Sequence, residues 1–431
     1  MFTELKQQLS QQLAALRETQ GWVELRAEIA ADDCNLLAWL KGQSHFPQSF
    51  WQSRSGEQTF ATLGEAVAFD DLDAAQVFSE QTGFRLFGGV KFEGQCCLLL
   101  PRLRFAKNSQ KATACLYLNG ANLAEEKAIC EKWLAEIGNV ATLAGVENRV
   151  LQQTAVSDFA RWQANIGKAI DAITQQQFRK VVLANAATLE CERAISPYDL
   201  LAASQQKNHG CYHFLWAENA AEAFVGSSPE RLYQRHDRQF ETEALAGTVA
   251  VSEDPAETAR NGEWLLQDPK NIYENQLVVD DIQHHLADCV SEFCVGEAAL
   301  KRLPNVQHLR RQIRAILKPQ ISDADCLARI HPTAAVAGLP RPPAVAFIQQ
   351  NEGFTRGWYA AALGHFAPNH AEFCVALRSA TVTPHFITLY AGAGIVAASE
   401  AAAEWQEIER KGRAIKGIFN NLRTKSHKDY I

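Results

Sequence analysis

The stretch that decides the fold is residues 211–230, which read CYHFLWA, ENAAE, AFVG and SSPE. Two strand-like apolar runs, at 211–217 and 223–226, are separated by a short polar segment. The second run ends in a turn rich in glycine, serine and proline, which are residues that interrupt regular structure. This stretch therefore predicts short strands joined by turns.

Similar patterns recur along the chain. Apolar and polar residues alternate over residues 22–29, which predicts a half-buried strand. Further strands are expected at 85–92, 95–103, 114–118 and 180–184. Helices are expected at about 123–137, after a capping Ser157, and from Ser196-Pro197 onward. Many short strands, several long helices and no regular βαβ alternation predict an α+β fold with large, mainly antiparallel β-sheets packed as a sandwich, with helices on the outside.

Composition limits the classes of function. A hydrophobic content of 47% and a charged content of 21% are typical of a globular protein, and the net charge of -7 argues against nucleic-acid binding. The eleven cysteines show neither CxxC pairs nor metal-ligand spacing, which favours small core residues in a reducing compartment. No apolar run has the length of a signal peptide or a membrane span, so we expect a cytoplasmic protein without membrane contact.

The length of 431 residues favours two regions. The chain begins with apolar residues at helical spacing, Phe2, Leu5, Leu9, Leu13 and Leu16. Residues 138–148 form a plausible join. We expect an N-terminal α+β region at 1–150, which completes the sheet scaffold, and a catalytic region at 151–431.

Two acidic segments, far apart in the chain, each have the spacing of one helix face. Lys270 and Glu274 lie four residues apart, and a second set recurs at steps of four, three and four: Glu400, Glu404, Glu407 and Lys411. Each segment is either a solvated helix face or part of a site for a hard cation. In the second case Glu274 and Glu407 each give one oxygen to Mg²⁺, with water and a substrate carboxylate completing the octahedron. Zinc is disfavoured because the adjacent His284 and His285 face apart on a helix.

Lys180 and Glu230 are the candidates for proton transfer. Lys180 opens a strand in which Val182 and Ala184 share its face, and a lysine that loses hydration in a sheet-lined cavity can act as a general base. Glu230 follows the Gly-Ser-Ser-Pro turn, and in an apolar cleft its carboxyl stays protonated and can donate a proton. The alternatives are a strand-end lysine that reaches water and an acid in a surface turn.

Other candidates are a cation and two turns of small residues. Arg378, on the strand at 373–377 and its continuation, can clamp a carboxylate, or it can be exposed. The turns at 245–248 and 390–394 allow a ligand to approach backbone amides. Residues 390–394 do not match GxGxxG, so a dinucleotide site is rejected.

Taken together, the motifs resemble those of the chorismate-utilising enzymes and, within them, the isochorismate synthases. The resemblance spans roughly residues 155–425 and is carried by motifs in the family's order, at 180–184, 226–230, 245–248, 274–280, 331–333, 357–359, 376–378, 391–394 and 404–411. The N-terminal region is more similar to that of the menaquinone-pathway enzymes. Two positions depart from the family pattern: Asn275 stands where histidine is frequent, and Ala334 where proline is frequent.

The resemblance implies Mg²⁺-dependent conversion of chorismate to isochorismate. Lys180 activates a water that attacks C2, Glu230 protonates the departing C4 hydroxyl, and Glu274 and Glu407 hold the metal. The implied substrate-binding residues are Thr248, His331, Tyr359, Arg378, Gly392 and Lys411. No partner protein is implied, and we expect a monomer or weak dimer.

Three alternatives remain open. The first is an aminating enzyme of the family, an anthranilate or aminodeoxychorismate synthase large subunit. Lys180 and Ala246 argue against it, because aminating members usually carry glutamine at the first position and one of them has a lysine nucleophile at the second. A salicylate-forming enzyme would continue from isochorismate by eliminating pyruvate. A catalytically dead, chorismate-binding regulatory protein is disfavoured because both proton-transfer residues and both metal carboxylates are present.

Overall fold

The computed structural model describes residues 2–17, 19–31 and 33–416, so the last fifteen residues of the region expected at 151–431 lie outside the described residues. The helices are α1 (Phe2–Ala15), α2 (Leu36–Lys41), α3 (Leu72–Thr82), η1 (Gly120–Asn122), α4 (Leu123–Glu136), α5 (Phe159–Thr174), α6 (Pro197–Lys207), α7 (Pro255–Gln267), α8 (Pro269–Leu286), α9 (Asp323–Ile330), α10 (Arg341–Asn351) and α11 (Ala401–Lys416).

The strands are β1 (Trp22–Ala30), β2 (Gln48–Gln52), β3 (Thr59–Phe69), β4 (Leu86–Val90), β5 (Cys96–Lys107), β6 (Lys111–Asn119), β7 (Val150–Ala155), β8 (Lys180–Cys191), β9 (Tyr212–Ala217), β10 (Ala223–Ser228), β11 (Arg231–His236), β12 (Gln239–Ala250), β13 (Val290–Val295), β14 (Ala299–Arg302), β15 (Val306–Leu317), β16 (Gly338–Leu339), β17 (Ala362–Ala367), β18 (His370–Val375), β19 (Ser379–Val382) and β20 (Phe386–Ile395).

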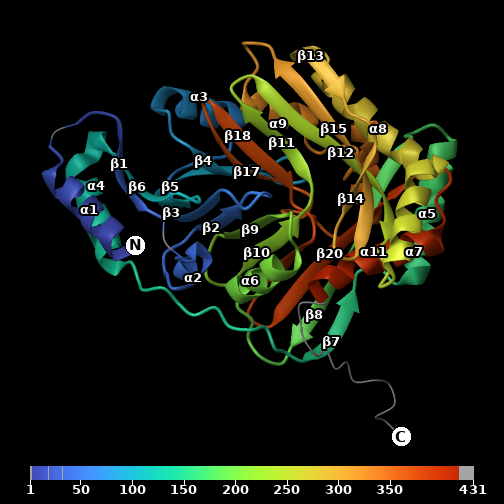
Figure 1. Ribbon diagram of the computed structural model, residues 1–431, viewed down its shortest axis with the longest axis horizontal. Coiled ribbons are helices and arrows are strands. Elements are labelled where there is room, and N and C mark those ends of the chain that lie inside the picture. Colours follow the sequence, from blue (N-terminus) through green and yellow to red (C-terminus); the bar gives the residue numbers. More distant parts are fainter. Residues whose placement is uncertain (1, 18, 32, 417–431) are drawn as a thin grey trace, which may run out of the picture.

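The strands form one connected antiparallel sheet that branches at β5. Strand β3 pairs with one edge of β5, whereas β4 and β6 share the other edge. One arm continues from β3 through β2, β9, β10, β19 and β20 to β8 and β7. The other arm continues from β4 through β17, β18, β11 and β12 to β15 (Figure 1). The expected α+β fold with antiparallel sheets is confirmed.

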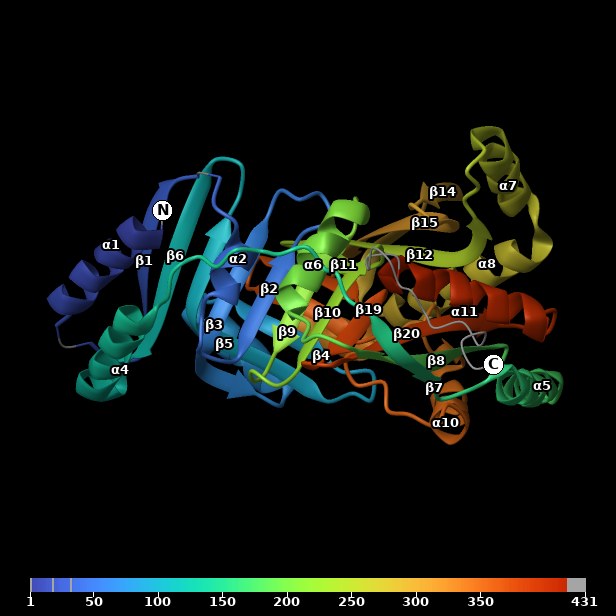
Figure 2. The same ribbon diagram turned by 90° about the horizontal axis from the view of Figure 1, so that it is seen from below.

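Apolar side chains from both arms meet in one large core. Trp51 and Phe214 enter it from the first arm, and Tyr233 and Phe373 enter it from the second. A separate core lies beneath α1, α2, α4 and α6, where Leu5 and other leucines of α1 are buried. Figure 2 shows α1 and α4 at one end of the molecule and α5, α7 and α8 at the other.

The chain passes from one arm to the other at two neighbouring points. Residues 229–230 join β10 to β11, and residues 376–378 join β18 to β19. Backbone hydrogen bonds link the two crossings, because Val375 N donates to Glu230 O (3.2 Å) and Ser227 N donates to Arg378 O (3.2 Å). Both crossings therefore hold their side chains at fixed places between the arms.

The local predictions differ from the structure mainly at element ends. The strand expected at 95–103 extends to Lys107, and the expected helix near 123–137 is α4. The capping prediction at Ser157 is wrong, because Asp158 caps α5 by accepting a hydrogen bond from Arg161 N (2.8 Å). The amide of Ser157 instead donates to Asn185. The domain boundary at residue 150 stays a prediction.

Candidate active site

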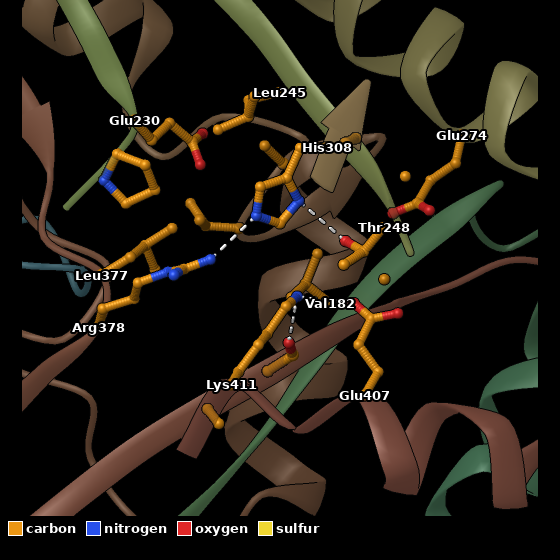
Figure 3. Close-up of a pocket in the computed structure, with 18 of the residues that line it drawn as sticks. Val182, Glu230, Leu245, Thr248, Glu274, His308, Leu377, Arg378, Glu407 and Lys411 are labelled. Atoms are coloured by element: carbon orange, nitrogen blue, oxygen red, sulfur yellow. Dashed lines mark hydrogen bonds and ion pairs between the residues drawn. The ribbon is translucent and has the colours of Figure 1, made fainter. Parts of the chain in front are cut away.

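A cavity opens beside the two crossings, between the arms and the helices α8 and α11 (Figure 3). The free space within its lining, part of it open to solvent, is about 770 Å³. It is lined by Val182, Pro229, Glu230, Leu245, Ala246, Gly247, Thr248, Glu274, His308, Ala335, Val336, Tyr359, Leu377, Arg378, Tyr390, Ala391, Gly392, Gly394, Glu407 and Lys411. Predicted site residues from seven motifs thus converge on one cavity.

Glu230 forms one wall of the cavity, and only 5% of its surface is exposed. Its backbone amide donates a hydrogen bond to Ser228 Oγ (3.2 Å). Burial, reinforced by the nearby charge of Glu243, raises the pKa of Glu230 to about 8, although three lysines oppose the shift. The carboxyl is therefore protonated at neutral pH and has a proton to donate.

Lys180 lies one layer behind the cavity lining. It begins β8 on the same face as Val182, which lines the cavity, and its side chain is 0% exposed. The Nζ atom is 3.1 Å from Glu274 Oε1, an ion-pair distance without hydrogen-bond geometry, and it has no hydrogen-bond partner among the described residues. An amine in this position is neither a strand-end group in water nor held by a directional bond.

A glycine on β20 makes room for this pair. A Cβ atom built on Gly394 would lie 2.1 Å from Glu274 Oε1 and 2.9 Å from Lys180 Cε. Both distances are below any normal contact, so a larger residue would displace the carboxylate, the amine or both. The segments 390–394 and 245–248, predicted as turns of small residues, are instead parts of β20 and β12. The small residue at position 394 is required by side chains packed over the strand.

Two facing helices supply the carboxylates. Glu274 on α8 and Glu407 on α11 both line the cavity and point toward each other (Figure 3). Lys411 Nζ contacts Glu407 Oε1 (2.7 Å) and donates to Gly392 O (3.0 Å). Glu404, nearly fully buried, pairs instead with Lys270 (2.7 Å). These are not the solvated helix faces that the sequence left open.

The donor set is one of oxygen atoms. Over the part of the chain that the structure describes, no three histidine, cysteine, aspartate or glutamate side chains gather as a group able to hold a metal ion. Glu274 and Glu407 can supply two of the six oxygen ligands of Mg²⁺, and water and a ligand carboxylate can complete the octahedron. Lys411 lies beside Glu407 and balances its charge from the protein side, whereas Lys180 lies beside Glu274.

Arg378 and Thr248 are joined by a histidine that sequence reasoning missed. His308 of β15 lies between them, with Nε2 3.0 Å from Arg378 Nη2 and Nδ1 3.0 Å from Thr248 Oγ1. Because arginine can only donate, Nε2 accepts and Nδ1 carries the proton that Thr248 receives. Burial first, and then the charge of Arg378, lowers the pKa of His308 well below its usual value, so the ring is neutral.

This arrangement leaves donors free for a ligand. The Thr248 hydroxyl accepts from His308, so its own proton can point into the cavity.

Arg378 is in the crossing rather than on a strand, contrary to the sequence-based placement, and its φ of 48° is in the left-handed region. A non-glycine residue held there costs about 1–3 kcal/mol, and such residues cluster at binding sites. Nothing in the sequence around His308 distinguishes it from an ordinary strand residue.

Two aromatic rings line the wall next to β20. Tyr359 and Tyr390 stack with ring centroids 5.1 Å apart, and both line the cavity. The Tyr390 hydroxyl is 3.0 Å from Thr381 Oγ1, which fixes its ring. Tyr359 was predicted from its motif, whereas the role of Tyr390 as a lining residue was not.

The structure does not bring His331 into the cavity lining. Its buried Nε2 is 3.3 Å from Lys91 O, and burial lowers its pKa to about 4. The two departures from the family pattern lie nearby and behave as scaffold. The Asn275 amide donates toward the carbonyls of β12 and β15, and the Ala334 amide donates to Asp281 (3.0 Å), which a proline could not do.

Comparison with known proteins agrees with this geometry. Residues 80–419 match the family model described as "Chorismate binding enzyme". The chain is 41% identical to isochorismate synthase MenF of Haemophilus influenzae over 92% of this chain and 91% of that protein, and 40% identical to that of Escherichia coli over 90% and 91%.

Solved structures show the same likeness. The menaquinone-specific isochorismate synthase MenF from Escherichia coli superposes with a TM-score of 0.91 at 37% identity, covering 97% of this chain and 99% of that one. Anthranilate synthase component I from Streptococcus pneumoniae, at 18% identity and a TM-score of 0.60, shares the fold and covers 93% of each chain. The resemblance found in the sequence is confirmed, and the chain belongs to the family of chorismate binding enzymes.

Proposed function

We propose that this protein is an isochorismate synthase, an isomerase that converts chorismate to isochorismate, and that its product enters menaquinone synthesis. The observation that carries the proposal is the pairing of a protonated acid and a buried amine around one cavity. Glu230 keeps its proton at neutral pH, and Lys180 lies behind the opposite, carboxylate-bearing wall. The relatives that match nearly the full chain bear the same name, which supports the assignment.

Lys180 and Glu230 each carry out one of the two proton transfers. Lys180 accepts a proton from the water whose oxygen bonds to C2 of the ring. Glu230 donates its proton to the C4 hydroxyl, whose C–O bond breaks as the ring double bonds shift, and the group leaves as water. Atoms and charge balance, because one water enters and one leaves, and solvent returns the proton from lysine to glutamate. Each positioned group contributes about 10²- to 10⁴-fold to the rate.

The remaining lining residues orient the substrate. Arg378 and Thr248, through the proton arrangement set by His308, present donors to the carboxylate of the enolpyruvyl group. Tyr359, Lys411 and the backbone at Gly392 line the same cavity and can contact the substrate as well. Holding the ring in one orientation removes several kcal/mol of the barrier, on the order seen for intramolecular reactions.

We also propose that Mg²⁺ is the cofactor. Glu274 and Glu407 fit it because they face each other with oxygen donors and no histidine or cysteine between them. When bound there, the ion would neutralise the ring carboxylate and withdraw electron density from the conjugated ring. His331 has no place in this proposal, since it lies outside the lining.

The proposal is tested by incubating the purified chain with chorismate and Mg²⁺ and following products by chromatography. Isochorismate should form without ammonia or a second protein, and a chelator should stop its formation. Salicylate as the end product would move the assignment to the pyruvate-eliminating branch. Dependence on ammonia would move it to the aminating branch, and tight chorismate binding without any product would indicate a regulatory protein.

No helix in residues 2–17, 19–31 or 33–416 combines the length and apolar character needed to cross a membrane. We propose a cytoplasmic enzyme that acts as a monomer. Size-exclusion chromatography at the concentration of the assay tests the second point.

A further inference from the structure

We propose that Arg54, Glu243 and Lys301 form a clamp that positions Glu230, so that a loop of the N-terminal region takes part in the reaction. The inference rests on the proposed function of Glu230 as the proton donor. None of the three clamp residues lines the cavity. They are therefore positioning residues, which act on the reaction through the backbone on both sides of the acid.

The first contact fixes the peptide before Glu230. The carbonyl oxygen of Pro229 accepts a hydrogen bond from Arg54 Nη1 (2.9 Å) and another from Lys301 Nζ. Arg54 comes from the turn between β2 and β3, and Lys301 comes from β14. Two cations from opposite arms of the sheet thus meet on one carbonyl, next to the proton donor.

The second contact fixes the peptide after Glu230. The amide of Arg231 donates to Glu243 Oε1 (3.1 Å), and the same oxygen accepts from Arg54 Nη1 (2.5 Å). Lys301 Nζ lies 3.7 Å from this oxygen. Burial acts to raise the pKa of Glu243, but the charges of Lys301 and Arg54 hold it below its usual value, so the carboxylate stays ionised.

The clamp therefore closes around a single residue. The peptide on its N-terminal side is held by two cations, the peptide on its C-terminal side is held by an anion, and the cations and the anion contact each other. A carboxyl group that must donate a proton in one direction needs its main chain held to within a fraction of an ångström, and a misplacement of about 1 Å can cost 10²-fold in rate. The clamp supplies this rigidity from residues separated widely in the chain.

The clamp also sets the charge around the donor. Glu243 from β12 raises the pKa of Glu230, whereas Lys301 from β14, Lys180 from β8 and Lys411 from α11 lower it. Tyr359 faces the same carboxyl and is neutral, because burial raises its pKa. Lys301 itself has a pKa lowered to about 8 by burial. Removing the Glu243 charge should thus move the titration of Glu230 to lower pH.

Three variants test the clamp, with a matched control. Arg54→Ala should lower kcat for isochorismate formation by about 10- to 100-fold while KM changes by less than about threefold, and Arg54→Lys should recover part of the loss. The control is Arg102→Ala, because Arg102 also bonds one carboxylate, Glu126 (2.5 Å), and one carbonyl, that of Tyr117 (2.9 Å), in the same region but away from the cavity. Equal losses of kcat in Arg54→Ala and Arg102→Ala would overturn the clamp.

The third variant, Glu243→Gln, is tested by a measurement that does not depend on enzymatic turnover. The infrared signal of the Glu230 carboxyl is identified by its absence in Glu230→Gln, and its change with pH gives the titration midpoint of Glu230. In Glu243→Gln this midpoint should fall by at least about half a pH unit, because a nearby like charge is lost. An unchanged midpoint together with full kcat in Arg54→Ala refutes the clamp. A shifted midpoint in a protein that makes no isochorismate keeps the clamp and refutes the proposed function instead.

Discussion

The two sides of the cavity are built in different ways. On the acid side, Glu230 is held by backbone contacts to other strands and by the clamp from three separate parts of the chain. On the carboxylate side there are two separate ion pairs, Glu274 with Lys180 and Glu407 with Lys411, and Lys411 also donates to Gly392 O. The position and protonation of the donor are thus set by the fold, whereas the carboxylate side is set by mutual charge and should respond to what binds there.

Replacing either proton-transfer group should have the largest effect. Glu230→Gln removes the proposed proton donor and Lys180→Ala removes the proposed acceptor, so each should lower kcat by about 10²- to 10⁴-fold with little change in chorismate binding. Initial rates and equilibrium binding of chorismate measure the two effects separately. A suitable control is Glu372→Gln, which replaces a buried carboxyl bonded to Tyr212 (2.9 Å) outside the cavity. A Glu230→Gln variant with nearly full kcat would remove this residue from the acid role.

Crowding the carboxylate side without removing any charge should have the next largest effect. Gly394→Ala puts a methyl group where Glu274 and Lys180 meet, so we expect kcat to fall by roughly tenfold or more, as for other displaced reacting groups. Gly167→Ala is the matched control, because that glycine is within α5 and has nothing within 4 Å of an added Cβ. Comparable activity in the two variants would contradict the packing argument.

The comparison also separates what local sequence could predict from what it could not. The Gly-Ser-Ser-Pro turn, the strand face of Lys180 and the spacing of Glu404, Glu407 and Lys411 are local patterns, and each was readable from the sequence. Arg54, His308 and Lys301 belong to ordinary loops and strands, and their importance arises only when the arms of the sheet bring them to Glu230 or Arg378. Contacts of that kind leave no periodic signal.

The sequence also could not predict how far behind the cavity lining a side chain lies. Alternation along β8 gives the face of Lys180 correctly, but the layer it occupies, behind Glu274 and Gly394, depends on α8 and β20. His331 belongs to a motif of the family, yet its ring is directed to Lys91 O rather than to the cavity. Whether a motif residue touches a ligand depends on the packing around it, which a motif does not encode.

The metal requirement gives a smaller, graded test of the carboxylate side. Glu407→Gln should raise the Mg²⁺ concentration for half-maximal activity by more than about tenfold, because the proposed oxygen ligand loses its charge. Loss of a group that only supports a ligand costs about tenfold or more in metal affinity. Glu409→Gln, an exposed position on the same helix, is the control and should leave the requirement unchanged. Equal Mg²⁺ dependence in both variants would argue that Glu407 does not hold the ion.

The smallest expected effect is on stability, and it belongs to the acid side. Burial raises the pKa of Glu230 from its ordinary value near 4.5 to about 8, so the folded chain keeps a proton that the unfolded chain releases. Stability from this group is complete below about pH 4, falls as pH rises and is lost by about pH 8, with an upper bound of about 5 kcal/mol. Glu230→Gln cannot ionise, so its melting temperature should exceed that of the native chain by a few degrees at pH 8 and match it near pH 4. Thermal unfolding across this range measures the difference, and a gap independent of pH would show that the acid is not held protonated by the fold.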